Sequence, residues 1–282
     1  MIQKICVAGA GTMGSGIALC AAQHNLEVIL FDLNEVVLNK AKEQIQKNLT
    51  FLVEKNKISM EESTAVLKRI SFTNNIQDCK APLIIEAIIE KPEAKIDLFN
   101  QLNTINNTDT IFASNTSSLS INLLQHSIPN PERVAGLHFF NPAQIMKLVE
   151  VVKATDTSEK TINTLVEFCE TLNKKAVVCI DAPGFIVNRV ARHYYLEAMK
   201  LVEENIATIE SVDEIMEASG FKMGPFKLMD LIGNDINLAV TQSLYDAFDK
   251  EKRFEPSILQ INKVKAGELG KKTSKGFYEY KA

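Results

Sequence analysis

The chain has 282 residues and a formal net charge of -4, with 46% hydrophobic and 23% charged residues. This length allows one large or two ordinary domains with a buried core, and the composition excludes a disordered or fibrous chain. The small negative charge, without a run of Lys and Arg, argues against nucleic-acid binding.

The sequence runs from Met1 directly into an apolar strand pattern at Ile5, without the basic and apolar regions of a leader peptide. No apolar run approaches the ~20 residues of a membrane-spanning helix. We therefore expect a soluble, cytoplasmic protein that does not bind membranes. Its five cysteines are odd in number and lack C-x-x-C spacing, which indicates reduced thiols and no metal site.

Short apolar runs alternate with longer amphipathic stretches over residues 5–180, as expected of βαβ units around a mostly parallel sheet. Between the second and third runs, residues 34–69 have helical apolar spacing and predict a helical excursion. The predicted strands are 5–8, 28–31, 83–87, 110–113, 134–137, 148–152 and 177–180.

Strand-like runs stop after the Asp181-Ala182-Pro183-Gly184 segment, and helical periods broken by Gly and Pro continue to the end. The predicted fold class is α/β, with a Rossmann-like doubly wound sheet and its helical excursion in residues 1–182. Residues 183–282 are predicted to form a separate all-α domain.

A glycine-rich turn follows the first predicted strand and opens a helix of small residues. Glycines in the Gly-x-Gly-x-x-Gly pattern allow a tight turn, close approach of backbone to a pyrophosphate, and close packing of helix on strand. The helix N-terminus adds N–H groups and the positive end of its dipole. The pattern predicts a dinucleotide site with the cofactor-binding residues Gly9, Gly11, Thr12, Met13 and Gly14.

The second predicted strand ends in Asp32, near the ~20-residue spacing expected of a ribose-binding acid. A carboxylate accepts from a ribose 2′-hydroxyl but repels a 2′-phosphate, so Asp32 favours NAD over NADP. The plain alternative, that Asp32 is the N-cap of the following helix, is compatible with the same role.

Three further segments carry polar groups at or just beyond predicted strand ends, the edge where open α/β sheets bind ligands. They are Ala113-Ser114-Asn115-Thr116-Ser117-Ser118-Leu119, Gly136-Leu137-His138-Phe139-Phe140-Asn141-Pro142 and Lys147-Leu148-Val149-Glu150-Val151-Val152. Two later segments also carry motifs that we compare with known families. They are Ala182-Pro183-Gly184-Phe185-Ile186-Val187-Asn188-Arg189 and the terminal Gly276-Phe277-Tyr278. Together with the glycine-rich turn, these motifs resemble the 3-hydroxyacyl-CoA dehydrogenase family, and most of all its short-chain bacterial members that act on 3-hydroxybutyryl-CoA.

The resemblance implies an NAD-dependent oxidoreductase of fatty-acid and butanoate metabolism. Its substrate would be a short-chain 3-hydroxyacyl-CoA thioester, with hydride transfer between NAD and the C3 hydroxyl or ketone, as in the 3-hydroxybutyryl-CoA and acetoacetyl-CoA pair. The resemblance also implies that the helical domain helps to bind substrate and forms a homodimer.

The same resemblance assigns roles to individual residues of this chain. It implies that His138 is the general acid/base and that Glu150 pairs with it. Ser117 and Asn188 would bind the reacting oxygens and hold the substrate. Finally, the positions implied along the cofactor and substrate path are Asn141 at the nicotinamide, together with Glu90 and Lys95.

The chemistry supports the histidine independently. Hydride removal from an alcohol also releases the hydroxyl proton, and histidine exchanges protons readily near neutral pH. Of the four histidines, only His138 lies in a polar cluster, and a carboxylate at Glu150 would fix its tautomer and stabilise its protonated form. The plain alternatives are a core histidine bound to a carbonyl and a solvated strand glutamate.

Ser117 has the alternative role of capping a helix that begins near Leu119, although Thr116 or Ser118 could cap it instead. Asn188, early in the helical domain, has the alternative role of a loop cap. If both bind substrate, the active site is a cleft between the two domains. For the phosphates of CoA, Lys55 in the helical excursion resembles the family's basic position, and an ordinary solvated helix face is an equally good interpretation.

Two other functions compete with this interpretation. Another two-domain β-hydroxyacid or phosphogluconate dehydrogenase would be expected to use a lysine base from the helical domain. A non-catalytic relative would keep NAD binding and lose its acid/base group. The presence of both His138 and Glu150 argues against each of them.

Overall fold

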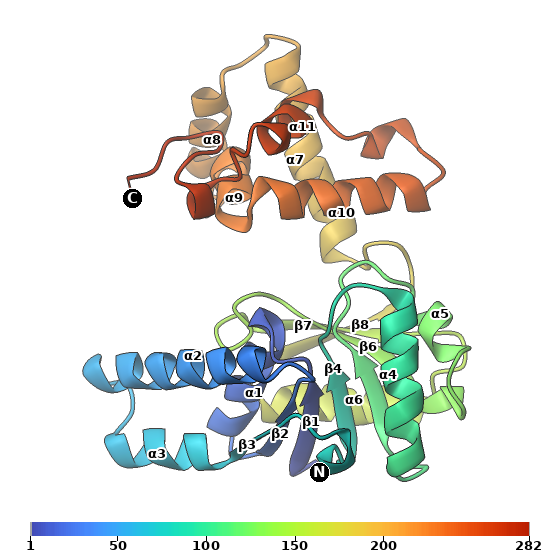
Figure 1. The fold of residues 1–282 in the computed structure, drawn as a ribbon. Helices are drawn as coiled ribbons and strands as arrows, with labels where there is room; N and C mark the ends of the chain where they lie inside the picture. Colours follow the sequence, from blue (N-terminus) through green and yellow to red (C-terminus); the bar gives the residue numbers. More distant parts are fainter. Residues whose placement is uncertain (1, 282) are drawn as a thin grey trace. The chain divides into compact units, whose positions relative to one another are not determined.

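The computed structural model describes residues 2–281, and the chain divides into two compact units between Ala182 and Pro183 (Figure 1). No helix in this described part is long and apolar enough to cross a membrane. The five cysteines are free thiols, and four of them are buried.

The first unit is built on an eight-stranded sheet in the order β3-β2-β1-β4-β5-β6-β7-β8. Neighbouring strands are parallel except β6 and β7, which pair antiparallel. The strand order reverses between β1 and β4, the switch point at which open α/β sheets bind ligands. The strands are β1 Lys4–Ala8, β2 Glu27–Phe31, β3 Ile70–Thr73, β4 Leu83–Glu86, β5 Ile111–Ser114, β6 Val134–Phe139, β7 Leu148–Lys153 and β8 Lys175–Ile180.

Helices cover both faces of this sheet, with α1, α2, α3 and α6 on one face and α4 and α5 on the other. Successive side chains of a strand point to opposite faces. Ile111 therefore joins the core under α1 and α6, whereas Phe112 packs edge-on against Phe99 of α4. The helices are α1 Thr12–Gln23, α2 Glu35–Glu54, α3 Met60–Lys68, α4 Pro92–Ile105, α5 Ile121–Gln125 and α6 Glu159–Thr171, with the 3-10 turns η1 Ile76–Asp78 and η2 Pro131–Arg133.

The second unit is helical. Its core joins α7, α8 and α9 through buried side chains that include Met199, Val212 and Phe226. The elements are α7 Val187–Glu203, α8 Ile209–Ala218, α9 Pro225–Ile232, α10 Asn234–Ala247, α11 Ile258–Lys265, and the 3-10 turns η3 Lys252–Phe254 and η4 Lys271–Thr273.

Two buried aspartates fasten the C-terminal segment to this unit. Asp230 accepts from the backbone N–H groups of Phe277 and Tyr278 at 2.9 Å, and Asp213 accepts from the Tyr278 hydroxyl at 2.9 Å. Burial, and then this bond to Asp213, raise the pKa of Tyr278. A Cβ at Gly276 would lie 2.0 Å from Oδ1 of Asp230, so the segment needs glycine there.

The predicted fold class is confirmed, with a Rossmann-like sheet followed by a helical part. The predicted excursion consists of α2 and α3, and each predicted strand is present with ends that differ by a few residues. The sequence does not predict β3 (Ile70–Thr73), which has four residues at the sheet edge and only one of them buried. Such a short edge strand leaves almost no periodic pattern in a sequence.

Candidate active site

The glycine-rich turn joins β1 to α1 at the switch point of the sheet. Gly9 has a φ of 108°, and a Cβ there would lie 2.5 Å from the Ala87 carbonyl oxygen, just beyond β4. A Cβ at Gly14 would lie 1.7 Å from the Gly9 oxygen, whereas one at Gly11 would meet nothing within 4 Å. Thus Gly9 allows the turn, Gly14 allows close helix packing, and Gly11 leaves open surface at the start of α1, which fits a dinucleotide phosphate.

Asp32 joins the end of β2 to this turn. Its Oδ2 accepts from the Ala10 N–H and its Oδ1 from the Asn34 N–H, both at 2.9 Å. The N-cap of α2 is Asn34, whose side chain accepts from Val36 N, so the capping alternative for Asp32 is wrong. Asp32 instead holds a carboxylate beside the glycine-rich turn, where the sequence predicts the ribose-binding acid.

His138 and Glu150 face each other on the antiparallel strands β6 and β7, as directly opposed partners in the register. The distance from His138 Nδ1 to Glu150 Oε2 is 2.7 Å. The side chains are 8% and 1% exposed, and the ring of Phe140 lies 4.5 Å from the imidazole, centroid to centroid. The structure therefore brings together the two residues that the sequence pairs, in surroundings that exclude most water.

The segment of residues 115–119, after β5, carries Ser117 and is called the Ser117 segment. It is hydrogen-bonded to β6, the strand of His138. Asn115 Oδ1 accepts from the Phe139 N–H at 2.8 Å, next to His138 in the chain. Helix α5 begins at Ile121 and is capped by Ser120, so the helix expected near Leu119 begins two residues later. This contact of Asn115 could not be predicted from the sequence, because a single Asn in a polar segment gives no distinguishing pattern.

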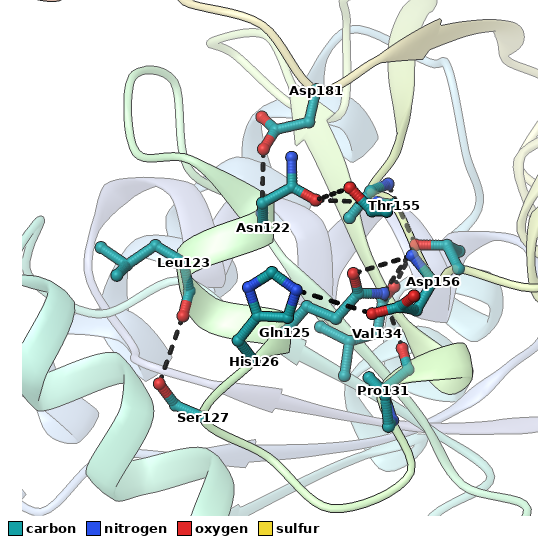
Figure 2. Close-up of polar contacts among 12 residues, drawn as sticks. Asn122, Leu123, Gln125, His126, Ser127, Pro131, Val134, Thr155, Asp156 and Asp181 are labelled. Atoms are coloured by element: carbon teal, nitrogen blue, oxygen red, sulfur yellow. Dashed lines mark hydrogen bonds and ion pairs between the residues drawn. The ribbon is translucent and has the colours of Figure 1, made fainter.

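Helix α5 is fastened on both sides (Figure 2). Asp181, just after β8, accepts from Ser120 Oγ and from the Asn122 N–H, both at 2.8 Å. Figure 2 shows the bond to Asn122. The Asn122 side chain in turn accepts from the N–H and the hydroxyl of Thr155, beyond β7. These contacts hold the chain immediately after the Ser117 segment in a fixed position.

A buried charge network lies between β4 and the Ser117 segment. Lys95 is fully buried, and its Nζ lies 2.6 Å from Glu86 Oε1 and 3.1 Å from Glu90 Oε2. Ser114 Oγ donates to Glu86 at 2.6 Å, and the Ser117 N–H donates to Glu90 at 3.2 Å. Lys95 and Glu90, both expected from the sequence, are therefore paired directly. Lys95 also binds Glu86, which appears in the sequence only as a charge interrupting an apolar run.

The two carboxylates of this network have opposite pKa shifts. Burial raises the pKa of Glu86, and Lys95 and Ser114 oppose this only in part. Burial would also raise the pKa of Glu90, but Lys95 and the hydrogen bonds from Thr116 and Ser117 outweigh it and hold that pKa below its ordinary value. Glu90 thus stays ionised beside the Ser117 segment.

A pocket of about 510 Å³ opens beside the glycine-rich turn. Its walls are the start of α1, the side of α2 with Lys40, Gln44 and Asn48, and the loop after β6 with Asn141 and Gln144. Lys40 is the one charged residue among the lining residues. Neither it nor Gln44 and Asn48 was expected from the sequence, because polar residues on a helix surface are ordinarily solvated.

Lys55 does not line this pocket. It is the C-cap of α2, and its Nζ lies 5.6 Å from the centre of the Phe51 ring. Asn188 belongs to the second unit, where it is the second residue of α7. The predicted roles of Lys55 and Asn188 stay predictions.

Two family models together match almost the whole chain. Residues 4–182 match the model described as "3-hydroxyacyl-CoA dehydrogenase, NAD binding domain", and residues 184–280 match "3-hydroxyacyl-CoA dehydrogenase, C-terminal domain". The chain therefore belongs to the 3-hydroxyacyl-CoA dehydrogenase family, as the sequence motifs predict, and NAD is its cofactor.

Individual relatives agree with this assignment. The chain is similar to the 3-hydroxyadipyl-CoA dehydrogenase of Escherichia coli, with 44% identity over 100% of the chain, and it spans 60% of that relative's length. It is 40% identical to a probable 3-hydroxybutyryl-CoA dehydrogenase of Deinococcus radiodurans, over 98% of the chain and 100% of the relative. Among solved structures, the (S)-3-hydroxybutyryl-CoA dehydrogenase of Ralstonia eutropha matches with a TM-score of 0.95, 34% identity and full coverage of both chains.

Proposed function

We propose that the protein is an NAD-dependent dehydrogenase of short-chain 3-hydroxyacyl-CoA thioesters, interconverting the C3 hydroxyl and ketone. The observation that carries this proposal is the buried pair of His138 and Glu150, 2.7 Å apart at the ligand-binding side of a Rossmann-like sheet. Two relatives named for 3-hydroxybutyryl-CoA and one named for 3-hydroxyadipyl-CoA support the substrate class.

In this proposal His138 transfers the proton of the C3 hydroxyl. NAD supplies the hydride acceptor for oxidation and, as NADH, the hydride donor for reduction. Glu150 accepts from Nδ1 and thereby leaves Nε2 to take the proton, and its charge stabilises the imidazolium that forms. Burial of both groups strengthens this stabilisation because few water molecules screen it.

Ser117 and Asn188 are proposed to donate to the oxygens of the acyl group, and Asn141 to hold the nicotinamide end of the cofactor. Glu90 is hydrogen-bonded to the Ser117 N–H, so the position of Ser117 depends on the charge network of Glu90 and Lys95. These contacts orient the substrate carbon for hydride transfer, and orientation is itself a large part of catalysis.

The pocket beside α2 is proposed to take the tail of CoA. It is open, it adjoins Asn141, and its polar wall of Lys40, Gln44 and Asn48 suits phosphates and amides. Lys40 supplies the positive charge there, and Lys55, farther along α2, would contact the nucleotide end.

The direct test is the oxidation of NADH by acetoacetyl-CoA, followed by absorbance. We expect turnover with acetoacetyl-CoA and none with free acetoacetate, because the pocket beside α2 would have no tail to bind. A series of longer and of dicarboxylic 3-ketoacyl-CoA esters then defines the acyl preference. Turnover of a free β-hydroxyacid without CoA would favour the competing class of β-hydroxyacid dehydrogenases.

A further inference from the structure

Lys174 is a buried charge outside the site described so far. It lies in the turn between α6 and β8 and is 7% exposed. Its Nζ donates to the Ala143 carbonyl at 2.6 Å and to the Met146 carbonyl at 2.7 Å. Both partners are neutral backbone groups, so the ammonium is held by hydrogen bonds rather than by an opposite charge.

Both carbonyls belong to the loop of residues 140–147 that connects β6 to β7. Within it, the N–H groups of Ile145 and Met146 both donate to the Pro142 carbonyl, at 3.0 and 2.9 Å. Two carbonyls three residues apart converge on a single nitrogen, which fixes the curvature of the loop. Without Lys174 the buried Ala143 carbonyl would lose this hydrogen bond.

This loop forms part of the site. Its residues Asn141, Pro142 and Gln144 line the pocket beside α2. It also lies directly against α1, since a Cβ at Gly16 would be 3.3 Å from the Ala143 Cβ. A shift of the loop would therefore disturb both the pocket and the start of the cofactor-binding helix.

The turn that carries Lys174 is itself fixed. The next residue, Lys175, donates its N–H to the Lys147 carbonyl at 2.6 Å, at the far end of the same loop. On the other side, burial raises the pKa of the Cys20 thiol of α1, and the neighbouring Lys174 charge opposes this. Lys174 thus connects the turn between α6 and β8 to the loop that lies against α1.

We propose that Lys174 is a positioning residue for the dehydrogenase reaction, which holds the 140–147 loop in the shape that cofactor and acyl-CoA require. It does so without touching either of them. The inference rests on the proposed function for its consequence in catalysis, and on the loop geometry alone for its structural part.

The first test measures the loop without any ligand, by hydrogen–deuterium exchange at the Ile145 and Met146 amides. The test variant is Lys174→Met, which keeps the length of the side chain and removes its charge. The matched control is Lys175→Met, an exposed neighbour whose backbone bond to Lys147 remains. We expect exchange about tenfold faster in Lys174→Met, equivalent to ~1.4 kcal/mol, and unchanged exchange in Lys175→Met.

The second test measures NADH affinity and steady-state kinetics in the same variants. We expect the Kd for NADH and the KM for acetoacetyl-CoA to rise about tenfold in Lys174→Met. The pH profile of kcat should stay as in the parent, because the His138 and Glu150 pair is untouched. A purely structural role would lower the amount of folded protein and leave these constants unchanged.

Lys174→Arg keeps the charge and the donors, so it should recover at least part of the lost protection and affinity. If Lys174→Met exchanges and binds NADH like the parent, or if Lys174→Arg is as impaired as Lys174→Met, the proposal is overturned. A parent protein that binds NADH but does not reduce 3-ketoacyl-CoA would contradict the proposed function instead, and would do so whatever Lys174→Met does to the loop.

Discussion

Asp32 and His138 illustrate what single residues reveal. Asp32 follows an apolar strand, and His138 lies in one. A carboxylate and an imidazole are both groups that a dehydrogenase uses, so the places of these residues at the ligand-binding side of the sheet could be predicted from the sequence. The structure adds partners that no spacing indicates. Asp32 accepts from the Ala10 N–H across 22 residues, and His138 opposes Glu150 only because β6 and β7 pair antiparallel in one register.

At Asp32 we expect a selective effect on cofactor binding. Asp32→Ala removes a charged acceptor, and such hydrogen bonds contribute ~1.5–3 kcal/mol, so the Kd for NADH should rise at least tenfold. The parent should bind NADH far better than NADPH. Glu35→Ala, an exposed acid at the start of α2, is the control and should bind NADH normally. Equal affinity of the parent for NADH and NADPH would refute the ribose-binding role.

At the scale of elements, the turn between β1 and α1 offers a matched pair of glycine substitutions. Gly11→Ala places a methyl group in open space at an ordinary φ of -66°, so the melting temperature should stay near that of the parent while NADH binding is lost. Gly14→Ala places a methyl group 1.7 Å from the Gly9 oxygen and should lower both stability and NADH binding. Thermal unfolding and NADH titration of the two variants test this. Full NADH affinity in Gly11→Ala would argue against a phosphate at the start of α1.

The network between β4 and α4 gives a prediction with a definite pH dependence. Lys95→Met leaves Glu86 buried without its cation, and breaking a buried ion pair costs ~3–5 kcal/mol. Because Glu86 already has a raised pKa, its carboxylate in the variant should protonate more readily on folding. A raised carboxyl pKa in the folded state lowers stability as the pH rises through it.

The deficit in the free energy of unfolding of Lys95→Met, relative to the parent, should therefore be larger at about pH 8 than at about pH 5. Denaturant titrations at both values measure it. Lys91→Met, an exposed lysine just before α4, should show no such deficit. A deficit for Lys95→Met that is the same at both pH values would mean that Glu86 does not titrate.

The elements could be predicted to different degrees. Long helices and buried strands have strong periodic patterns, and α2 with α3 was expected as a helical excursion. The edge strand β3 and the pocket beside α2 could not be predicted, because both depend on which surface of an element faces another. Lys40 and Lys55 lie on the same helix α2, and only the fold distinguishes the one that lines a pocket from the one at the helix end.

At the scale of the whole molecule, the division of the chain near residue 182 follows from where strand patterns stop. The sequence does not give the position of either unit relative to the other, and the expected cleft that would bring Asn188 to His138 stays a prediction. The family could be predicted from the sequence, because several independent motifs occur in one order along almost the whole chain.

We expect the protein to form a homodimer through its helical unit. Large apolar side chains are exposed there, among them Ile215 at 63%, Leu231 at 50% and Ile236 at 51%, which is typical of a surface that another chain covers. Light scattering should give twice the chain mass of 31.4 kDa at micromolar concentration. A mass of one chain, independent of concentration, would exclude the dimer.

The central claim is that His138 transfers the proton and that Glu150 acts through it. The most direct measurement is the turnover of His138→Gln, Glu150→Gln and the double variant with acetoacetyl-CoA and NADH, with NADH affinity measured alongside. Loss of a positioned acid/base group lowers the rate by ~100- to 10,000-fold, so the turnover of His138→Gln should fall by at least about 100-fold. Glu150→Gln should lose less, and the double variant should resemble His138→Gln alone, because both changes act on one group. NADH affinity should stay near that of the parent throughout. If His138→Gln kept turnover within a few fold of the parent, with hydride transfer shown to be rate-limiting by a deuteride isotope effect, the assignment would be wrong, and a lysine of the helical unit would be the base to test next.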